Sequence, residues 1–268
     1  MKKVIVYFLS LVVFASCNNT EETVNNLPNA IIFPQTISYA VIKIYPHDTT
    51  SFTQGLFFHN NKMYEGTGWY KESKLMVVDL NTGKAEKRIA LADSVFGEGI
   101  TLLNNKIYQL TWQNHKVYVY DANTFKKEKE FEWPFEGWGI THNDSSLIIS
   151  TGGSNLYFVN PATFKIERTV GVSDNNGYID SINELEYVNG SIYANKYLTD
   201  IILKINPKTG IIEGKVDLSN LVKESGSSYD PRSLDAGLVL NGIAYNQEKK
   251  NFYLTGKRWP FIAEVKFN

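Results

Sequence analysis

The sequence predicts an all-β protein, and more specifically a five-bladed β-propeller closed by pairing of its N- and C-terminal strands. Three observations lead to this prediction. Short apolar and aromatic runs, typical of β-strands, recur along the chain. Turn-forming residues follow several of these runs at matching positions. The repeat interval of 40 to 60 residues is the size of one propeller blade.

The composition fits one large folded domain. The chain has 268 residues, 43% of them apolar and 21% charged, which is too apolar and too weakly charged for a disordered protein. A net charge of −1 without a basic block argues against a nucleic-acid partner. One cysteine excludes an internal disulfide framework, and four scattered histidines lack metal-ligand spacing. We therefore expect no metal and no cofactor.

The N-terminal segment predicts export from the cytoplasm. A short basic start precedes the apolar residues 4–16, which are too few to span a bilayer but typical of a signal peptide. The segment ends before Cys17, the single cysteine, and resembles a bacterial lipoprotein signal whose cysteine carries the lipid. A plain secretory signal is the alternative. The expected organisation is a lipoprotein signal peptide over 1–16, a tether over 17–36 and one propeller domain over 37–268, periplasmic or in the cell envelope and anchored through Cys17.

Two recurring phrases define the repeat. A strand phrase of the type Lys-Ile-Tyr begins at positions 62, 106, 146, 191 and 251, in steps of 44, 40, 45 and 60 residues. A turn phrase, Asp or Asn followed three residues later by Thr, begins at positions 79, 121, 160 and 206. We count five units, of which the last has only its early strands. The leading strand Ile37–Tyr45 is predicted to complete that unit, because ring closure removes exposed strand edges. An open β-sandwich is the alternative fold, but it does not require five units in phase.

Equivalent positions of the repeat should converge on the propeller axis, because the first strand of each blade lines the central channel. One position in this strand is occupied by Gln54, Glu98, Trp138, Asn183 and Asn241, in steps of 44, 40, 45 and 58 residues. A second set of equivalent positions, on the next strand or its turn, consists of Gly68, Trp112, Gly152, Tyr197 and Lys257. A third set contains Glu65 and Gln109.

The first set combines one titratable carboxylate with amides and an aromatic wall. Small-molecule sites are commonly built in this way. The alternative is structural: polar residues line a water-filled channel and the indole only packs. The sequence therefore favours a small-molecule site at one mouth of the channel.

Several longer phrases follow one another along the chain: SFTQGL, YEGTG, FGEGITLLN, GWGIT, INELEYVNG, LNGIAY and TGKRWP. From about residue 44 to residue 267, the chain with these phrases resembles the glutaminyl-peptide cyclotransferases of the plant and bacterial type. It implies a five-bladed propeller that cyclises the N-terminal glutamine of peptides or proteins to pyroglutamate, releasing ammonia without a metal. The implied partners are peptides or proteins with N-terminal glutamine, and we expect a monomer.

The resemblance also implies roles for individual residues. Matching motif positions give the catalytic set: Glu98 as the catalytic carboxylate, with the active-site residues Asn183 and Lys257. The expected substrate-binding set, from the matching motifs and the repeat positions, is Gln54, Glu65, Trp112, Trp138, Tyr197 and Asn241.

The chain departs from the family pattern at three places. Tyr197 stands where the family usually has Trp, Lys71 where it usually has Gly, and Thr151 near a usual Asp. Tyr keeps a flat ring but is smaller and adds a hydroxyl, so affinity or side-chain preference should differ. The other two departures bear on loop shape.

Two other function classes stay open at this point. The propeller could be a non-catalytic module that binds a peptide or a sugar in its central channel. A metal-dependent, lactonase-like propeller would need several carboxylates near the axis, whereas the first-strand set supplies one.

Overall fold

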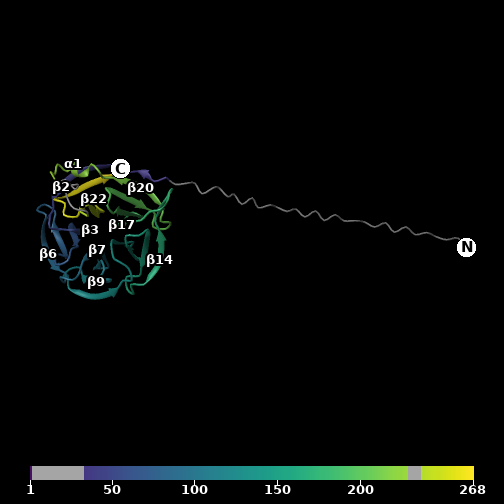
Figure 1. Cartoon of the computed structure of the whole chain (residues 1–268), viewed down its shortest axis with the longest axis horizontal. Helices are drawn as coiled ribbons and strands as arrows, with labels where there is room; N and C mark the ends of the chain where they lie inside the picture. Colours follow the sequence, from purple (N-terminus) through teal and green to yellow (C-terminus); the bar gives the residue numbers. More distant parts are fainter. Residues whose placement is uncertain (2–32, 229–236) are drawn as a thin grey trace. The chain divides into compact units, whose positions relative to one another are not determined.

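The computed structural model describes Met1 and residues 33–228 and 237–268. Two units are distinguished, Met1–Ile31 and Ile32–Asn268, and the second contains every strand named below. Figure 1 shows the strands of this unit arranged in a ring, with β3, β7 and β17 near its centre and β6 and β14 at its periphery. The predicted five-bladed all-β propeller is confirmed.

Each blade is an antiparallel four-stranded sheet that runs from the axis outward. Blade 1 consists of β3 (Thr53–His59), β4 (Lys62–Thr67), β5 (Lys74–Asp79) and β6 (Lys84–Ala90). Blade 2 consists of β7 (Gly97–Leu103), β8 (Lys106–Thr111), β9 (Lys116–Asp121) and β10 (Lys127–Glu132). Blade 3 consists of β11 (Ile140–His142), β12 (Leu147–Ser150), β13 (Asn155–Val159) and β14 (Ile166–Gly171).

Blade 4 carries additional short elements beside its four main strands. The main strands are β17 (Ile182–Val188), β18 (Ser191–Lys196), β19 (Ile201–Ile205) and β20 (Ile212–Asp217). The additional elements are β1 (Gln35–Thr36), parallel to β20, the two-stranded ribbon β15 (Ser173–Asp174) and β16 (Gly177–Tyr178), and the one-turn helix α1 (Leu221–Glu224).

Blade 5 closes the ring with strands from both ends of the propeller. Its strands are β21 (Leu240–Asn246), β22 (Asn251–Gly256), β23 (Phe261–Phe267) and β2 (Tyr39–Pro46). β2 pairs antiparallel with β23, from Tyr39 opposite Phe267 to Pro46 opposite Phe261. The predicted closing strand is confirmed and lies within about two residues of its expected bounds.

The hydrophobic core consists of five clusters, each between two neighbouring blades, among the residues that the structure describes. The second and third strands of the blades are buried on both faces, as in LMVV of β5, because a blade packs on each side. Outermost strands such as β10, with the sequence KEKEFE, are largely exposed. This burial gradient explains why apolar strand runs and charged strand runs alternate along the sequence.

In blades 1 to 4 the repeated turn phrase forms the same hydrogen bond, from the Thr backbone N–H to the side-chain oxygen of the Asp or Asn three residues earlier. In blade 1 the Thr82 backbone N–H and hydroxyl both donate to Asp79 Oδ1, at 2.8 and 3.1 Å. In blade 4 the Thr209 backbone N–H donates to Asn206 Oδ1 at 3.3 Å. The predicted turn chemistry between the third and fourth strands is therefore confirmed.

A buried carboxyl group links the inner strands of three blades. Glu184 of β17 accepts hydrogen bonds from the backbone N–H groups of Leu56 on β3, at 3.2 Å, and Ile243 on β21, at 2.8 Å. Burial raises the pKa of Glu184 well above its ordinary value, and nearby Glu186 raises it further. Blades 4, 1 and 5 are thus tied together at the axis.

Candidate active site

Four of the five residues of the first-strand set lie at irregularities of the innermost strands, whereas Trp138 lies in the segment directly before β11. The register between first and second strands shifts at Thr53/Gly55, Gly97/Ile100, Ile182/Leu185 and Leu240/Ile243, the positions that flank or contain Gln54, Glu98, Asn183 and Asn241. A β-bulge re-aims a side chain and interrupts strand pairing. In blades 1, 2, 4 and 5 the repeated sequence phrase therefore corresponds to a repeated irregularity of the strand pairing.

A cavity of about 480 Å³ opens at this level of the ring. Its polar lining consists of Gln54, Glu98, Asn183 and Lys257. Its aromatic lining consists of Phe52, Trp69, Tyr70, Phe96, Trp112, Trp138 and Tyr197. The structure thus brings seven of the nine predicted catalytic and substrate-binding residues to one cavity, from all five blades.

Glu98 is the carboxyl group of this cavity. Glu98 is only 5% exposed, and its Oε1 accepts a hydrogen bond from Gln54 Nε2 at 3.0 Å. Burial raises the pKa of Glu98 well above its ordinary value; Lys257 opposes this rise and Glu136 adds to it. A carboxyl group with a raised pKa can hold and deliver a proton near neutral pH.

Lys257 supplies a buried amine from blade 5. It follows β22 directly and is 4% exposed. Its Nζ lies 4.8 Å from the ring centroid of Phe52 and 4.9 Å from that of Tyr197, which are cation–π distances. Burial lowers the pKa of Lys257 to about 8, although the Glu98 charge acts in the opposite direction.

The two indole walls are held by one carboxylate that the sequence analysis missed. Glu136 Oε2 accepts hydrogen bonds from Nε1 of Trp112, at 2.8 Å, and Nε1 of Trp138, at 3.3 Å. Its Oε1 accepts one from Gln113 Nε2 at 3.1 Å. Burial acts to raise the pKa of Glu136, but these hydrogen bonds outweigh it and the pKa is lowered. Glu136 is therefore a charged anchor that fixes both indoles.

Tyr197 and Asn183 complete the wall beside Trp138. The Tyr197 ring meets the Trp138 indole edge to face, with centroids 5.3 Å apart and planes at 83°. The backbone carbonyl of Asn183 accepts a hydrogen bond from the Ser150 hydroxyl at 2.6 Å. A Cβ on Gly139 would lie 2.1 Å from this carbonyl oxygen, so the close approach of these strands requires glycine.

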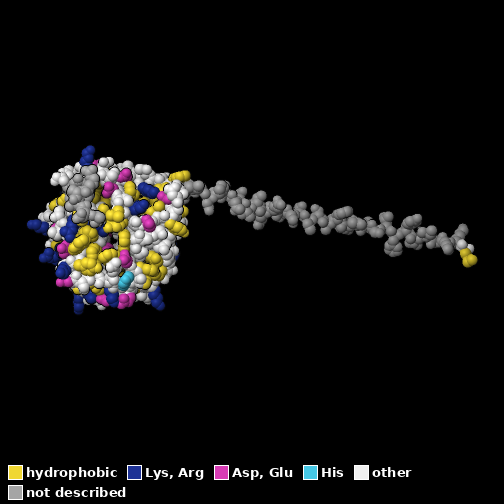
Figure 2. Space-filling model, viewed as in Figure 1, with side chains coloured by type: hydrophobic (Ala, Val, Ile, Leu, Met, Phe, Trp, Pro, Cys, Tyr) yellow, Lys and Arg dark blue, Asp and Glu magenta, His cyan; other side chains and the backbone are white. Residues whose placement is uncertain are grey.

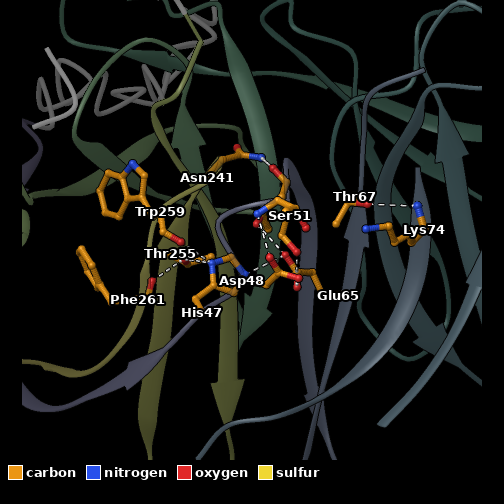
Figure 3. A network of polar contacts seen from close by, with 12 residues as sticks. His47, Asp48, Ser51, Glu65, Thr67, Lys74, Asn241, Thr255, Trp259 and Phe261 are labelled. Carbon is orange, nitrogen blue, oxygen red and sulfur yellow. Dashed lines mark hydrogen bonds and ion pairs between the residues drawn. The ribbon is translucent and has the colours of Figure 1, made fainter. Parts of the chain in front are cut away.

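Glu65 is placed away from the cavity, which corrects the prediction that it contacts substrate. As Figure 3 shows, its carboxylate lies beside His47 and Ser51. Glu65 Oε1 accepts from Thr53 Oγ1 at 2.7 Å and lies 3.0 Å from His47 Nε2; Oε2 accepts from Ser51 Oγ at 3.4 Å. His47 Nδ1 lies 2.7 Å from the carbonyl oxygen of Trp259. This buried network joins blade 1 to the closing blade.

Asn241 lies one layer behind the cavity, which corrects its expected contact with substrate. Its Nδ2 donates to the Thr53 carbonyl at 3.0 Å and to Gln54 Oε1 at 3.3 Å. Asn241 therefore orients Gln54, whose amide in turn donates to Glu98.

Several aromatic lining residues escaped the sequence analysis, although a signal for two of them was present. Phe52 and Phe96 each stand two residues before a member of the first-strand set, as does Glu136. Positions two apart share one face of a strand, so period-two reasoning from Gln54, Glu98 and Trp138 could have found all three. Trp69 and Tyr70 lie in a loop between β4 and β5, where strand periodicity says nothing.

Three further observations bear on the predictions. Within residues 33–228 and 237–268, no group of three or more His, Cys, Asp or Glu side chains is arranged to hold a metal ion. Over the same part of the chain, no helix has the length and apolar character needed to cross a membrane. Cys17, the predicted lipidation site, lies outside the described residues.

Comparisons with known proteins agree in fold and family. Residues 9–267 match the model of the glutamine cyclotransferase family. Over 228 residues the chain is 37% identical to the glutaminyl-peptide cyclotransferase of Arabidopsis thaliana, spanning 84% of this chain and 70% of that protein. The crystal structure of Myxococcus xanthus glutaminyl cyclase is similar with a TM-score of 0.80 and 32% identity, covering 88% of this chain and 98% of that chain.

Proposed function

Because the chain belongs to the glutamine cyclotransferase family, we propose that it cyclises the N-terminal glutamine of peptides or proteins to pyroglutamate and releases ammonia. The observation that carries the proposal is Glu98. It is a buried carboxyl group with a raised pKa, oriented by an amide, close to a buried lysine and enclosed by aromatic rings. These are the groups that an intramolecular acyl transfer from an amide requires.

The reaction needs a neutral amine, an electrophilic carbon and a proton for the leaving group. The α-amine nitrogen attacks the side-chain carboxamide carbon, a new C–N bond forms, and the old C–N bond breaks to release ammonia. A free α-amine has a pKa of about 7.7–8.0, so a substantial neutral fraction exists near neutral pH. Because both reacting groups belong to one residue, a cavity that selects the folded rotamer contributes much of the rate.

Glu98 is assigned the proton transfers. In this assignment its carboxyl group donates a proton to the departing nitrogen and receives the one that the attacking amine loses. A positioned acid or base of this kind contributes about 10²- to 10⁴-fold. Gln54 holds the Glu98 carboxyl group by a hydrogen bond of 3.0 Å, which supports an oriented role for it.

Lys257 and Asn183 are assigned to the carboxamide oxygen, which becomes an oxyanion during attack. Fixed donors or charges aimed at a developing oxyanion act strongly in a site that excludes water. Although burial lowers the pKa of Lys257 to about 8, this value still lies above neutral pH, so most of its amine is protonated there. The indoles of Trp112 and Trp138 supply flat apolar walls for the glutaminyl stem.

The decisive experiment measures ammonia release from peptides with an N-terminal glutamine. The wild-type protein should release one ammonia per peptide and leave a product with a blocked N-terminus. Matched controls are the same peptide with an acetylated amine, which lacks the nucleophile, and one that begins with asparagine, whose attack would need a four-membered ring. Peptide binding without ammonia release would overturn the proposal in favour of a non-catalytic binding propeller.

We further propose that the protein is an exported lipoprotein of the bacterial cell envelope, anchored through Cys17, and acts as a monomer. The apolar segment over 4–16 and the position of Cys17 directly after it support the anchor. Cells fed a labelled fatty acid should label the wild-type protein and carry it in the membrane fraction. Cys17→Ser should lose the label; a variant that stays labelled would contradict this assignment. Sedimentation of the propeller tests the monomer.

A further inference from the structure

The cavity is graded from a buried polar end to an exposed aromatic end. Glu98 and Lys257 lie deep, whereas Trp69 is 46% and Tyr70 44% exposed. Phe96 connects the two levels. Figure 2 shows hydrophobic side chains gathered over β3 and β7, the inner strands of blades 1 and 2. The exposed end of the cavity is therefore a preformed aromatic rim, which we define as Trp69 and Tyr70.

The rim is packed against the buried rings and does not stand free in solvent. Trp69 lies 5.1 Å from Phe52 and 6.2 Å from Phe96 between ring centroids. Tyr70 meets Phe96 edge to face at 5.5 Å. Arg258 lies 5.5 Å over the Trp69 ring and pairs with Glu72 at 3.2 Å. The rings are thus supported from below and from one side.

The backbone of the loop is fixed in an uncommon conformation. Trp69 has φ of +93° and Lys71 has φ of +68°, in the left-handed region that favours glycine. The Trp69 carbonyl accepts hydrogen bonds from the Ser73 N–H at 2.9 Å and the Ser73 hydroxyl at 2.7 Å. The Lys71 N–H donates to the Asp93 carbonyl at 3.1 Å. Unfavourable backbone angles held by several hydrogen bonds are typical of functional loops, and here they present two rings to the cavity.

The direction of a bound peptide follows from the position of the acid. The reacting amine and carboxamide must reach Glu98 and Lys257 at the buried end. The first peptide bond then points outward, and the second side chain reaches the level of Trp69 and Tyr70. Resting on the proposed function, we propose that these two residues form a subsite for an aromatic or large apolar side chain at the second position of the substrate.

The test compares kcat/KM for two peptides that differ only at the second residue, Gln-Phe and Gln-Ala. The wild-type protein should prefer Gln-Phe, because ring contacts and apolar burial both favour it. Trp69→Ala should reduce the Gln-Phe to Gln-Ala ratio by about tenfold, with the loss mainly in KM. Trp69→Leu should give an intermediate ratio, because it keeps apolar contact without the ring. The matched control is Tyr178→Ala, an aromatic residue 78% exposed on β16 and outside the cavity lining, which should change neither rate.

The outcomes separate this inference from the proposed function. If the wild-type protein turns over both peptides and Trp69→Ala lowers both rates equally, or leaves their ratio unchanged, the subsite is refuted while the activity stands. If wild-type protein releases ammonia from neither peptide, the proposed function fails and the subsite fails with it. A selective loss for Gln-Phe in both Trp69 variants supports the subsite.

Discussion

Lys257 should make the fold less stable than the same fold with an apolar residue at that position. Its pKa of about 8 in the folded protein compares with 10.5 for an exposed lysine, and the difference corresponds to about 3 kcal/mol. Because the folded-state pKa is depressed, the folded state binds fewer protons than the unfolded state between about pH 8 and 10.5. The cost of Lys257 is therefore complete below about pH 8 and disappears above about pH 10.5.

The perturbation that tests this reasoning is Lys257→Met, which keeps an unbranched side chain of similar length. The variant also loses the cation–π contacts with Phe52 and Tyr197, worth about 0.5–2 kcal/mol. The expected net gain in the free energy of unfolding at pH 7 is about 1–3 kcal/mol. Under the proposed function the same substitution should strongly reduce turnover, so Lys257 would be retained for activity at a cost in stability.

Equilibrium urea unfolding, followed by tryptophan fluorescence, measures the gain at pH 7 and again above pH 10. The denaturation midpoint should rise at pH 7 with an unchanged m-value, and the difference from wild type should shrink at the higher pH. The control Lys62→Met removes a lysine that is 54% exposed at the side chain and paired with Glu86, and should stay within about 0.5 kcal/mol. A variant that is destabilised at pH 7, with no dependence on pH, would refute the reasoning.

Three other substitutions test the site and its support. Glu98→Gln should lower kcat about 10²- to 10⁴-fold while leaving the fold intact, since the new amide oxygen can still accept from Gln54; near wild-type rates would dismiss Glu98 as the acid. Glu136→Gln should raise KM because a neutral amide oxygen holds the two indole N–H groups more weakly than the carboxylate does. It should also move the Glu98 limb of the pH–rate profile to lower pH, because the Glu136 charge raises the Glu98 pKa; an unmoved limb would contradict this. For the buried pair of His47 and Glu65, burial lowers the pKa of His47, but the interaction with Glu65 outweighs burial and the net pKa is raised. The pair therefore stabilises the fold fully below the unfolded pKa of about 6.5, and this stabilisation is lost as the pH rises through the raised value. Glu65→Gln should thus cost about 3 kcal/mol in thermal unfolding at pH 6 and less at pH 9; an equal loss at both would argue against the ion pair.

Repeat periodicity was sufficient to predict the ring and most of the cavity. In a propeller, equivalent positions in successive units lie at equivalent distances from the axis, so the spacing of Gln54, Glu98, Trp138 and Asn183 translated directly into proximity. The same reasoning was wrong for Glu65, which lies on the second strand. A side chain there can face the neighbouring blade, and Glu65 is drawn to His47 by charge and hydrogen bonding. Periodicity predicts how far from the axis a residue lies but not which face of the blade its side chain occupies.

The remaining features depend on contacts that the sequence does not encode locally. Glu136 is a charged residue beside a glycine, and its role follows only from two indole N–H groups that converge on it from different segments. Trp69 was unpredictable for another reason, since its exposure to the cavity requires positive φ values at residues that are not glycine. Single-sequence reasoning assigns such positions to ordinary turns.

The geometry of the site depends directly on closure of the ring. Glu98 comes from blade 2 and Lys257 from blade 5, while Gln54 of blade 1 donates a hydrogen bond to Glu98 and accepts one from Asn241 of blade 5. Blades 1 and 5 are held side by side by the pairing of β2 with β23 and by the apolar cluster between them, and Glu184 links their inner strands from blade 4. Ring closure therefore contributes to the placement of Glu98 and Lys257 at one cavity. Since the active groups are themselves costly to bury, the stability that holds them together has to come from the five apolar interfaces between blades.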